Sequence, residues 1–397
     1  MSEKIAVLGA SGFVGSMVLQ YMEAHSGYEV TPFAGSTGGA TALAHQGRSF
    51  KRIDLLDKKA LQSSLADFDC VINCSRGGNI VMEKGFENLL EVAAGCRMKK
   101  LVHISSVAVY GDPPHPDSVT EDAPTTGADG GYGAIKRDQD EKLQKAAASG
   151  LGAIILCPPN IIGPYSEYLL DIIESIERGR FRLVHSGQTA VNVIDVNALA
   201  AVILKAVESP IRDGRRLFVN HPERITWRDL CDALEPVLRT HAPIPPIDAD
   251  VLKQSDLGLG NGPDGRGKRR GGALKHLISE EVREALKKHP TWAALESAGK
   301  STVRVFGGRA ERYVRRVANG PIRVPSTPLP DPFDRPLVSQ QLRRVKHRPD
   351  RCLHDLGMEL PIDFRQSMQH FNDWYRRYFD ADSDAWQLLG HRADCVG

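Results

Sequence analysis

The sequence has 397 residues, enough for one large domain or two ordinary domains with a sizeable core. Its formal net charge of +2 gives no indication of an acidic polymer as a partner. The basic Gly/Lys/Arg stretch at 258–272 has no interleaved aromatic residues, so we expect no nucleic-acid binding through it. No apolar run approaches the ~20 residues that a membrane-spanning helix needs, so we expect no membrane span.

The cysteines and the N-terminus bear on the compartment. Seven cysteines are scattered along the chain, without a spacing typical of zinc ligands or of a disulfide framework. An apolar strand begins almost directly after Met1, which leaves no room for a secretory signal. These features predict a cytoplasmic protein without a bound metal.

The first element predicts a nucleotide-binding turn. Ile5–Leu8 is a short apolar run typical of a buried parallel strand, and a helical pattern continues through Met22. Between them, glycines let the backbone approach a pyrophosphate, and the first-turn amides of the helix point at it. On spacing alone, a purely structural turn is the alternative. The expected cofactor contacts are Gly9, Ser11, Gly12, Phe13, Val14 and Gly15.

Further strands alternate with helical stretches. This alternation predicts an α/β fold with a doubly wound parallel sheet, whose ligands bind at the carboxyl ends of the strands. The Ser105-Ser106 pair follows one such strand. Farther along, Thr226 and Asp229 predict a capping box at a helix start. The expected strands are 28–33, 50–54, 70–73, 101–105, 153–157, 181–184 and 217–220.

Tyr132 and Lys136 form a candidate acid/base pair at the head of a predicted helix. Residues four apart lie on one face of a helix, so the ammonium can sit beside the phenol. A neighbouring cation favours the phenolate and lowers the pKa of a tyrosine from ~10 towards working pH. Ser106 could then hold a substrate oxygen while Tyr132 moves its proton.

The sequence resembles the extended short-chain dehydrogenases/reductases, the NAD-dependent epimerase/dehydratase-like group that includes sugar-nucleotide epimerases. The resemblance implies a Rossmann domain over residues 1–158, to which 188–207 return, and a smaller C-terminal substrate-side domain over 159–397. Within the latter, residues 243–335 read as an atypical insertion. The motifs that carry the resemblance are Gly9–Gly15, Asp54–Asp57, Ser105–Gly111, Tyr132 with Lys136, Pro159–Pro164, Val193–Val196 and Leu356–Pro361.

The resemblance also implies the roles of individual residues. Ser106, Tyr132 and Lys136 would be catalytic, and Ser106 is preferred to Ser105 because of its spacing from the Val-Tyr-Gly turn. Tyr132 and Lys136 would contact the cofactor as well, with Lys136 on the nicotinamide ribose. The other implied contacts are Asp54, Leu55 and Pro159 for the cofactor and Asn160 for the substrate.

The stretch after the second strand bears on the choice of cofactor. Family members that use NAD commonly carry an acidic residue there, which holds the ribose hydroxyls. Here the stretch is Phe33–Thr37, without a carboxylate. Ser36, Thr37 or Arg52 could receive a 2′-phosphate, so within NAD(P) the sequence favours NADP over NAD. The alternative is that residues 35–39 are only a flexible loop.

Departures from the family bear on the reaction and the substrate. Val107-Ala108 stands where sugar dehydratases have an Asp-Glu pair, so elimination of water lacks an evident acid. Gln188 stands where many sugar-nucleotide enzymes have an arginine that clamps the diphosphate. Arg76 replaces a small apolar residue and could reach a substrate phosphate or carboxylate. Other cations that could replace the missing arginine are Arg215, Arg216 and Arg348.

These features predict an NAD(P)-dependent oxidoreductase or epimerase that acts at a secondary alcohol or ketone, with a nucleotide-activated sugar as the small-molecule substrate. One alternative is an NADP-dependent reductase of a non-sugar metabolite, which the missing arginine and the insertion favour. Another is a non-catalytic, cofactor-sensing protein, against which the intact Ser, Tyr and Lys argue. The family also suggests a homodimer through the helix of Tyr132, if that helix has an exposed apolar face.

Overall fold

The computed structural model describes residues 3–35, 43, 46–96, 98–126, 131–247 and 333–379. The chain divides into two compact units, Met1–Gly260 with Phe333–Gly397 and Asn261–Pro332. All described residues belong to the first unit. Of the expected insertion 243–335, only 243–247 and 333–335 lie among the described residues.

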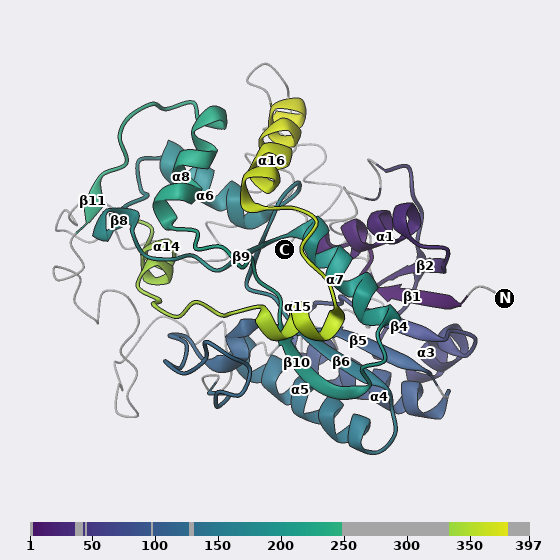
Figure 1. The fold of residues 1–397 in the computed structure, drawn as a ribbon. Helices are drawn as coiled ribbons and strands as arrows, with labels where there is room; N and C mark the ends of the chain where they lie inside the picture. Colours follow the sequence, from purple (N-terminus) through teal and green to yellow (C-terminus); the bar gives the residue numbers. More distant parts are fainter. Residues whose placement is uncertain are drawn as a thin grey trace, which may run out of the picture. The chain divides into compact units, whose positions relative to one another are not determined.

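The described part of the first unit is organised around a seven-stranded sheet in which neighbouring strands are parallel (Figure 1). The strand order is β10-β6-β5-β4-β1-β2-β3, so the direction of winding reverses between β1 and β4. The predicted doubly wound sheet is thereby confirmed. The strands are β1 (Lys4–Leu8), β2 (Glu29–Ala34), β3 (Lys51–Arg52), β4 (Cys70–Asn73), β5 (Lys100–Ile104), β6 (Ala153–Cys157) and β10 (Asp213–Phe218).

Helices cover both faces of the sheet (Figure 1). Successive side chains of a strand point to opposite faces, so both faces of a covered strand must be apolar. In β1, Ile5 and Val7 pack with α1 and α7, whereas Ala6 and Leu8 belong to the core on the opposite face. One layer contains α1 (Phe13–His25), α7 (Val196–Glu208) and α15 (Asp350–Leu356), and the other contains α3 (Lys58–Leu65), α4 (Phe86–Gly95) and α5 (Tyr132–Ala148).

The strands expected at 50–54, 181–184 and 217–220 differ most in extent from the observed ones, and the second of these shrinks to β8 (Leu183–Val184). The strand expected at 50–54 shrinks to β3, a short exposed edge of the sheet. The strand expected at 217–220 instead begins at Asp213, because β10 is an edge strand whose first half carries charged side chains. An apolar run therefore marks only the inner end of such a strand.

A second group of elements packs around its own apolar core, in which Trp227 and Phe371 are almost fully buried. The predicted capping box is confirmed: the Asp229 amide donates to Thr226 Oγ1 at 3.1 Å, and the Thr226 amide donates to Asp229 Oδ2 at 2.8 Å. The strand pairs are β7 (Asn160–Ile162) with β9 (Val193–Asp195) and β8 (Leu183–Val184) with β11 (Pro246–Ile247). The helices are α6 (Glu167–Glu177), α8 (Trp227–Leu234), α14 (Arg335–Gln341) and α16 (Phe364–Phe379).

Short helical turns complete the described structure. The turn most relevant to the site is the 3-10 turn Val107–Tyr110, which follows β5. The others are a π-helical turn at Val81–Gly85 and 3-10 turns at His185–Gly187 and Glu235–Val237.

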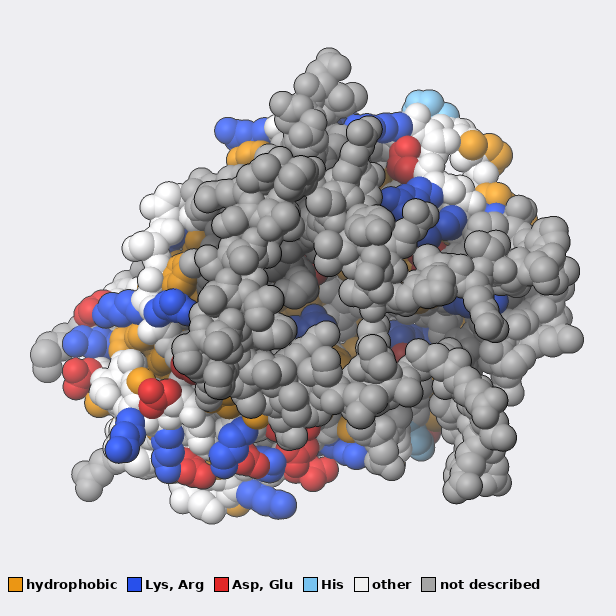
Figure 2. All heavy atoms as spheres, turned by 180° about the vertical axis from the view of Figure 1, so that it is seen from behind, with side chains coloured by type: hydrophobic (Ala, Val, Ile, Leu, Met, Phe, Trp, Pro, Cys, Tyr) orange, Lys and Arg blue, Asp and Glu red, His pale blue; other side chains and the backbone are white. Residues whose placement is uncertain are grey.

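Charged side chains of both signs mix on the outer surface of α4 and α5. Lys142 lies 2.8 Å from a Glu87 oxygen and 2.7 Å from an Asp138 oxygen. In Figure 2, basic and acidic side chains alternate along the lower edge. Such exposed pairs contribute about 0–1 kcal/mol each.

None of the described helices is long and apolar enough to cross a membrane. Among the same residues, no group of three or more His, Cys, Asp and Glu side chains is placed to hold a metal ion.

Candidate active site

The glycine turn connects β1 to α1 at the point where the sheet changes direction. Gly9 has a φ of +77°, a conformation that favours glycine. A Cβ at Gly9 would lie 2.7 Å from the Cys74 carbonyl oxygen, and one at Gly15 would lie 2.2 Å from the Gly9 carbonyl oxygen. Gly12 caps α1 without a side-chain acceptor, so the first-turn amides can take an anion. This tight turn, with no side chain bound to the first-turn amides of α1, fits the pyrophosphate of a dinucleotide.

The other expected adenine and ribose contacts fall near the end of β3. Leu55 is buried, and its carbonyl oxygen accepts a hydrogen bond from Asn88 Nδ2 at 2.9 Å. Asp54 is exposed, and its Oδ1 accepts from the Leu56 amide at 2.9 Å. Ser36, on which the expectation of NADP rested, lies outside the described residues.

The structure separates the two serines after β5. Ser106 lines a cavity, and its Oγ accepts from the Ala108 amide at 3.1 Å at the start of the 3-10 turn. Ser105 is only 3% exposed and lies behind this surface. A ligand in the cavity therefore meets Ser106, the serine that the motif spacing favours.

Tyr132 and Lys136 occupy the first turns of α5. Gly133 allows this helix to approach closely, because a Cβ there would lie 2.4 Å from the Ala108 carbonyl oxygen. Tyr132 is 40% exposed and faces the cavity with Ser106. Lys136 is almost fully buried, and its Nζ donates to the Ile104 carbonyl oxygen at 2.9 Å. The close approach thus brings the phenol and the serine hydroxyl to one surface.

Opposing influences set the pKa values of this pair. The pKa of Tyr132 lies above its usual value, contrary to the lowering that the sequence predicted, because burial raises it by more than the charge of Arg76 and the hydroxyl of Ser106 lower it. The Arg76 guanidinium carbon lies 5.2 Å from the centre of the Tyr132 ring. Burial lowers the pKa of Lys136 to about 8, and the charge of Asp140 opposes the shift. The sequence pointed to Lys136 as the cation beside the phenol, whereas Arg76 is the cation that acts most strongly on it.

A buried polar network lies beneath Lys136. Asp140 is fully buried, and Arg216 Nε donates to its Oδ2 at 2.8 Å. His103 Nε2 lies 3.9 Å from Asp140 Oδ1, and His103 Nδ1 lies 3.2 Å from Asn73 Nδ2. Burial holds the pKa of His103 well below its usual value, which keeps this imidazole neutral. The network anchors α5 to β5 and β10.

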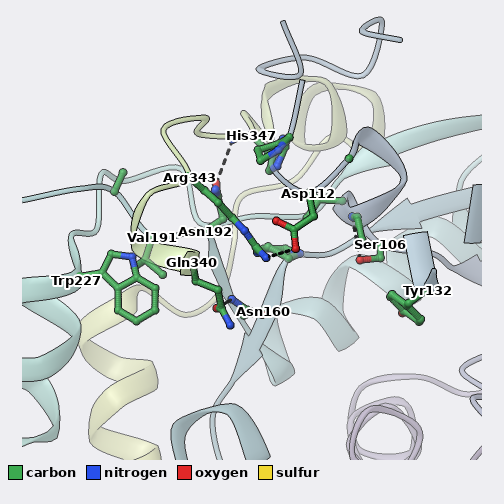
Figure 3. Close-up of a pocket in the computed structure, with 16 residues that line it drawn as sticks. Ser106, Asp112, Tyr132, Asn160, Val191, Asn192, Trp227, Gln340, Arg343 and His347 are labelled. Carbon is green, nitrogen blue, oxygen red and sulfur yellow. Dashed lines mark hydrogen bonds and ion pairs between the residues drawn. The ribbon is translucent and has the colours of Figure 1, made fainter. Parts of the chain in front are cut away.

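The cavity has a volume of about 300 Å³ (Figure 3). Pro159 and Asn160, the residues expected to contact cofactor and substrate, line it, and Asn160 Nδ2 donates to Gln340 Oε1 at 3.2 Å. Arg343 Nη2 donates to Asp112 Oδ2 at 2.6 Å within it. Sequence reasoning did not identify several lining residues, because no local motif marks them: Asp112, Trp227, Gln340, Arg343 and His347.

Arg343 is the arginine that the described structure places in this cavity. The cations suggested as substitutes for the missing arginine lie elsewhere. Arg216 pairs with buried Asp140, Arg215 pairs with Asp213 and Asp355, and Arg348 pairs with Asp350. Gln188 lines a different, neighbouring cavity.

The parallel sheet, the glycine turn at its change of direction and the Tyr/Lys helix define a Rossmann-type dinucleotide-binding protein. The chain belongs to the NAD-dependent epimerase/dehydratase family, whose sequence profile matches residues 5–219. A UDP-glucose 4-epimerase from Streptomyces lividans is 34% identical in an alignment 180 residues long, which covers 41% of this chain and 54% of that protein. The chain thus spans about half the length of this curated relative.

Solved structures agree on the fold. A dTDP-glucose 4,6-dehydratase from Bacillus anthracis, in complex with NAD, matches with a TM-score of 0.63 and 15% identity over 98% of this chain and 100% of that one. A UDP-glucose 4-epimerase from Thermotoga maritima, with UDP-glucose, matches with a TM-score of 0.62 and 14% identity over 94% and 99%. At these identities the likeness shows the fold alone.

Proposed function

We propose that the protein is an NAD-dependent oxidoreductase of the epimerase type, acting at a secondary alcohol of a nucleotide-activated sugar. The observation that carries the proposal is that Ser106, Tyr132 and Asn160 line one cavity at the carboxyl ends of the parallel strands, in a family of NAD-dependent epimerases and dehydratases. We take the pyrophosphate to lie on the turn Gly9–Gly15 and the nicotinamide ribose on Lys136.

NAD is the cofactor we propose. The B. anthracis dehydratase and a UDP-glucose 4-epimerase from Thermus thermophilus, which matches with a TM-score of 0.60 and 17% identity over 94% of this chain and 99% of that one, were solved in complex with NAD. NADP remains the alternative, because β2 ends at Ala34 without a carboxylate.

In the proposed reaction, a nicotinamide cofactor held on the turn Gly9–Gly15 and on Lys136 would supply hydride transfer at the carbinol carbon of the substrate. Tyr132 is the group that takes the hydroxyl proton and later gives it back, and the charge of Arg76 favours the phenolate that this transfer needs. The Ser106 hydroxyl donates to the substrate oxygen and so orients it. Lys136 stays charged below its pKa of about 8 and supplies positive charge near the phenolate at neutral pH.

The cavity favours redox chemistry over elimination of water. Val107 and Ala108, which also line it, offer no acid at the position where dehydratases carry one. Asp112 is a carboxylate in the cavity, but Arg343 binds it at 2.6 Å. Arg343 can turn to an anionic substrate group, and Arg76 is our second candidate for such a contact.

The cofactor can be identified directly. The purified protein is denatured, and the released nucleotide is identified by absorbance and mass. Retained NAD supports an epimerase that regenerates its own cofactor. A protein that is empty, and that NADPH but not NADH stabilises against heating, favours the NADP-dependent reductase. A protein that neither retains nor binds a dinucleotide contradicts the proposal.

The catalytic assignment has its own test. We expect Tyr132→Phe and Ser106→Ala to lower turnover of a nucleotide sugar by about 10²-fold or more. Tyr28→Phe, at the residue just before β2, controls for loss of a phenol as such. Wild-type turnover by Tyr132→Phe would overturn the mechanism. Competition by UDP separates a sugar-nucleotide substrate from a non-sugar metabolite.

The homodimer through α5 remains a prediction. It depends on an exposed apolar face of this helix, and the large apolar side chain that α5 exposes is Tyr132, which lines the candidate active cavity.

A further inference from the structure

A buried polar pair connects β4 and β5 beneath the loop that carries Arg76. Asn73, the last residue of β4, and His103 of β5 are register partners in the sheet, and neither residue is more than 2% exposed. His103 Nδ1 lies 3.2 Å from Asn73 Nδ2. A polar pair in the interior of a sheet lowers stability unless its groups bind one another or a further partner. The polar contacts of this pair run in two directions, towards the loop after β4 and towards α5.

The backbone of Ser75 fixes the direction of these hydrogen bonds. Its amide N–H, which can only donate, lies 3.1 Å from Asn73 Oδ1, and its hydroxyl donates to the same atom at 2.5 Å. This end of the Asn73 side chain is therefore the oxygen, and Nδ2 donates to His103 Nδ1. Burial and the charge of Lys136 hold the pKa of His103 well below its usual value, so the ring is neutral and carries its proton on Nε2.

The proton on His103 Nε2 faces α5. Nε2 lies 3.9 Å from Asp140 Oδ1, and Arg216 Nε donates to the other oxygen of this carboxylate at 2.8 Å. The ring of Phe86 packs against the imidazole, with the two ring centres 4.7 Å apart. His103 is thus held between α4 and α5, and its second nitrogen can fix the Asn73 side chain.

The loop that these bonds hold is the one that places Arg76. Arg76 directly follows Ser75, and its guanidinium lies over the Tyr132 ring. The Arg76 side chain is exposed, and within the described part of the chain no hydrogen bond or ion pair holds its guanidinium. The position of this cation therefore depends on the backbone of the loop, which the Asn73 side chain binds at Ser75.

We propose that His103 is a positioning residue for the proton transfer that we assign to Tyr132. It fixes the Asn73 side chain, which holds Ser75 and so keeps Arg76 over the phenol. The inference rests on the proposed function for its catalytic meaning, whereas the placement of Arg76 does not. Because His103 is neutral, replacing it removes no charge near Tyr132. Without the acceptor nitrogen of His103 the Asn73 side chain can turn, and a change in the pKa of Tyr132 then reports a displaced Arg76.

The test is a spectrophotometric titration of Tyr132 in the full chain, without substrate or cofactor. Tyrosinate absorbance is measured in the wild type, His103→Phe, Arg76→Met and the double variant, each corrected with Tyr132→Phe in the same background. We expect His103→Phe, which keeps a ring against α4, to raise the pKa of Tyr132, as Arg76→Met does. The double variant should match Arg76→Met, because His103 acts through Arg76. An unchanged pKa in His103→Phe, or shifts that add in the double variant, overturns the proposal.

Two further variants separate positioning from the loss of a buried imidazole. The side-chain amide of His103→Gln can accept from Asn73 and donate towards α5, so this variant should keep the pKa of Tyr132 near that of the wild type. His221 is another buried histidine, whose Nε2 accepts from the Asp195 amide at 3.2 Å. His221→Phe should leave the pKa of Tyr132 unchanged. Equal rises in His221→Phe and His103→Phe would overturn the proposal.

A milder variant decides the question if thermal unfolding shows that His103→Phe does not fold. Ser75→Ala removes one hydrogen bond to Asn73 from a half-buried loop residue. It should raise the pKa of Tyr132 by less than Arg76→Met does. A Tyr132 that titrates in Ser75→Ala as in the wild type would then contradict the role of His103.

Turnover of a nucleotide sugar separates this inference from the proposed function. A raised pKa of Tyr132 in His103→Phe, in a protein whose wild type has no turnover, keeps the placement of Arg76 and removes the proposed function. Wild-type turnover together with an unchanged pKa in His103→Phe keeps the function and removes the positioning role. If both hold, the acidic limb of the pH–activity profile should move to higher pH in His103→Phe.

Discussion

The Arg76 guanidinium carbon lies 5.2 Å from the centre of the Tyr132 ring. This contact joins the loop after β4 to the first residue of α5, so the phenol is covered by a cation from a different element. Positive charge over the ring stabilises the phenolate more than the phenol. Arg76 is thus placed to tune the residue to which we assign proton transfer.

Replacing Arg76 with methionine should raise the pKa of Tyr132 further, because the phenolate loses a stabilising charge. If catalysis needs the phenolate, the acidic limb of the pH–activity profile moves to higher pH by the same amount. Tyrosinate absorbance, corrected with Tyr132→Phe, measures the pKa directly. Arg76→Lys keeps the charge and should titrate close to the wild type. An unchanged titration in Arg76→Met would rule out this role.

Affinity for NAD should fall as the pH rises through about 8, where Lys136 loses its proton. Below that pH the affinity should be constant. Lys136→Met should bind NAD more weakly and with little dependence on pH over this range. Titration of NAD at a series of pH values compares the two proteins. A wild-type affinity that stays level above pH 8 would contradict the assignment of Lys136 to the cofactor.

Lys136 also predicts how stability depends on pH. Its folded pKa of about 8 lies below its unfolded value of 10.5, so the unfolded chain binds more protons between these values. The contribution of this residue to stability therefore rises from pH 8 to pH 10.5 and is least favourable below pH 8. Chemical denaturation should show Lys136→Met losing this rise. The prediction is contradicted if the free energy of unfolding has the same pH dependence in the wild type and in Lys136→Met.

Asp140→Asn should destabilise the fold by about 3–5 kcal/mol, because it leaves the largely buried Arg216 without its counter-charge. Asp138→Asn, two residues earlier on α5, removes only a partly exposed pair with Lys142 and should cost about 0–1 kcal/mol. Urea unfolding of the two variants provides the comparison. Similar losses would mean that the buried pair has no special weight.

Gly12→Ala and Gly15→Ala should separate folding from cofactor binding. A Cβ at Gly12 would lie 3.4 Å from the Gly9 oxygen, which the fold tolerates, but it would stand where the turn meets a pyrophosphate. At Gly15 the same distance is 2.2 Å, so the turn itself must move. We expect Gly12→Ala to keep its melting temperature but lose its stabilisation by NAD. Gly15→Ala should lose both. Full stabilisation of Gly12→Ala by NAD would place the cofactor elsewhere.

The sequence by itself determined the features that are encoded within a few residues. The strand–turn–helix unit from Ile5 to Met22, the capping box at Thr226 and the buried strands β4 and β6 all follow from local periodicity and turn chemistry. The Tyr132/Lys136 spacing belongs to the same class, because one helical turn fixes it. Family resemblance then ordered these local units into a doubly wound sheet.

Tertiary structure decided which side chains meet. Asp112 and Arg343 are 231 residues apart, and Asn160 and Gln340 are 180 apart, yet each pair is hydrogen-bonded in the candidate active cavity. Neither periodicity nor a short motif encodes such contacts, because they depend on the path of the whole chain between them. Packing between distant elements likewise decides that Ser106 lines the cavity while Ser105 is buried. The sequence thus determines the local units, and their packing determines the site.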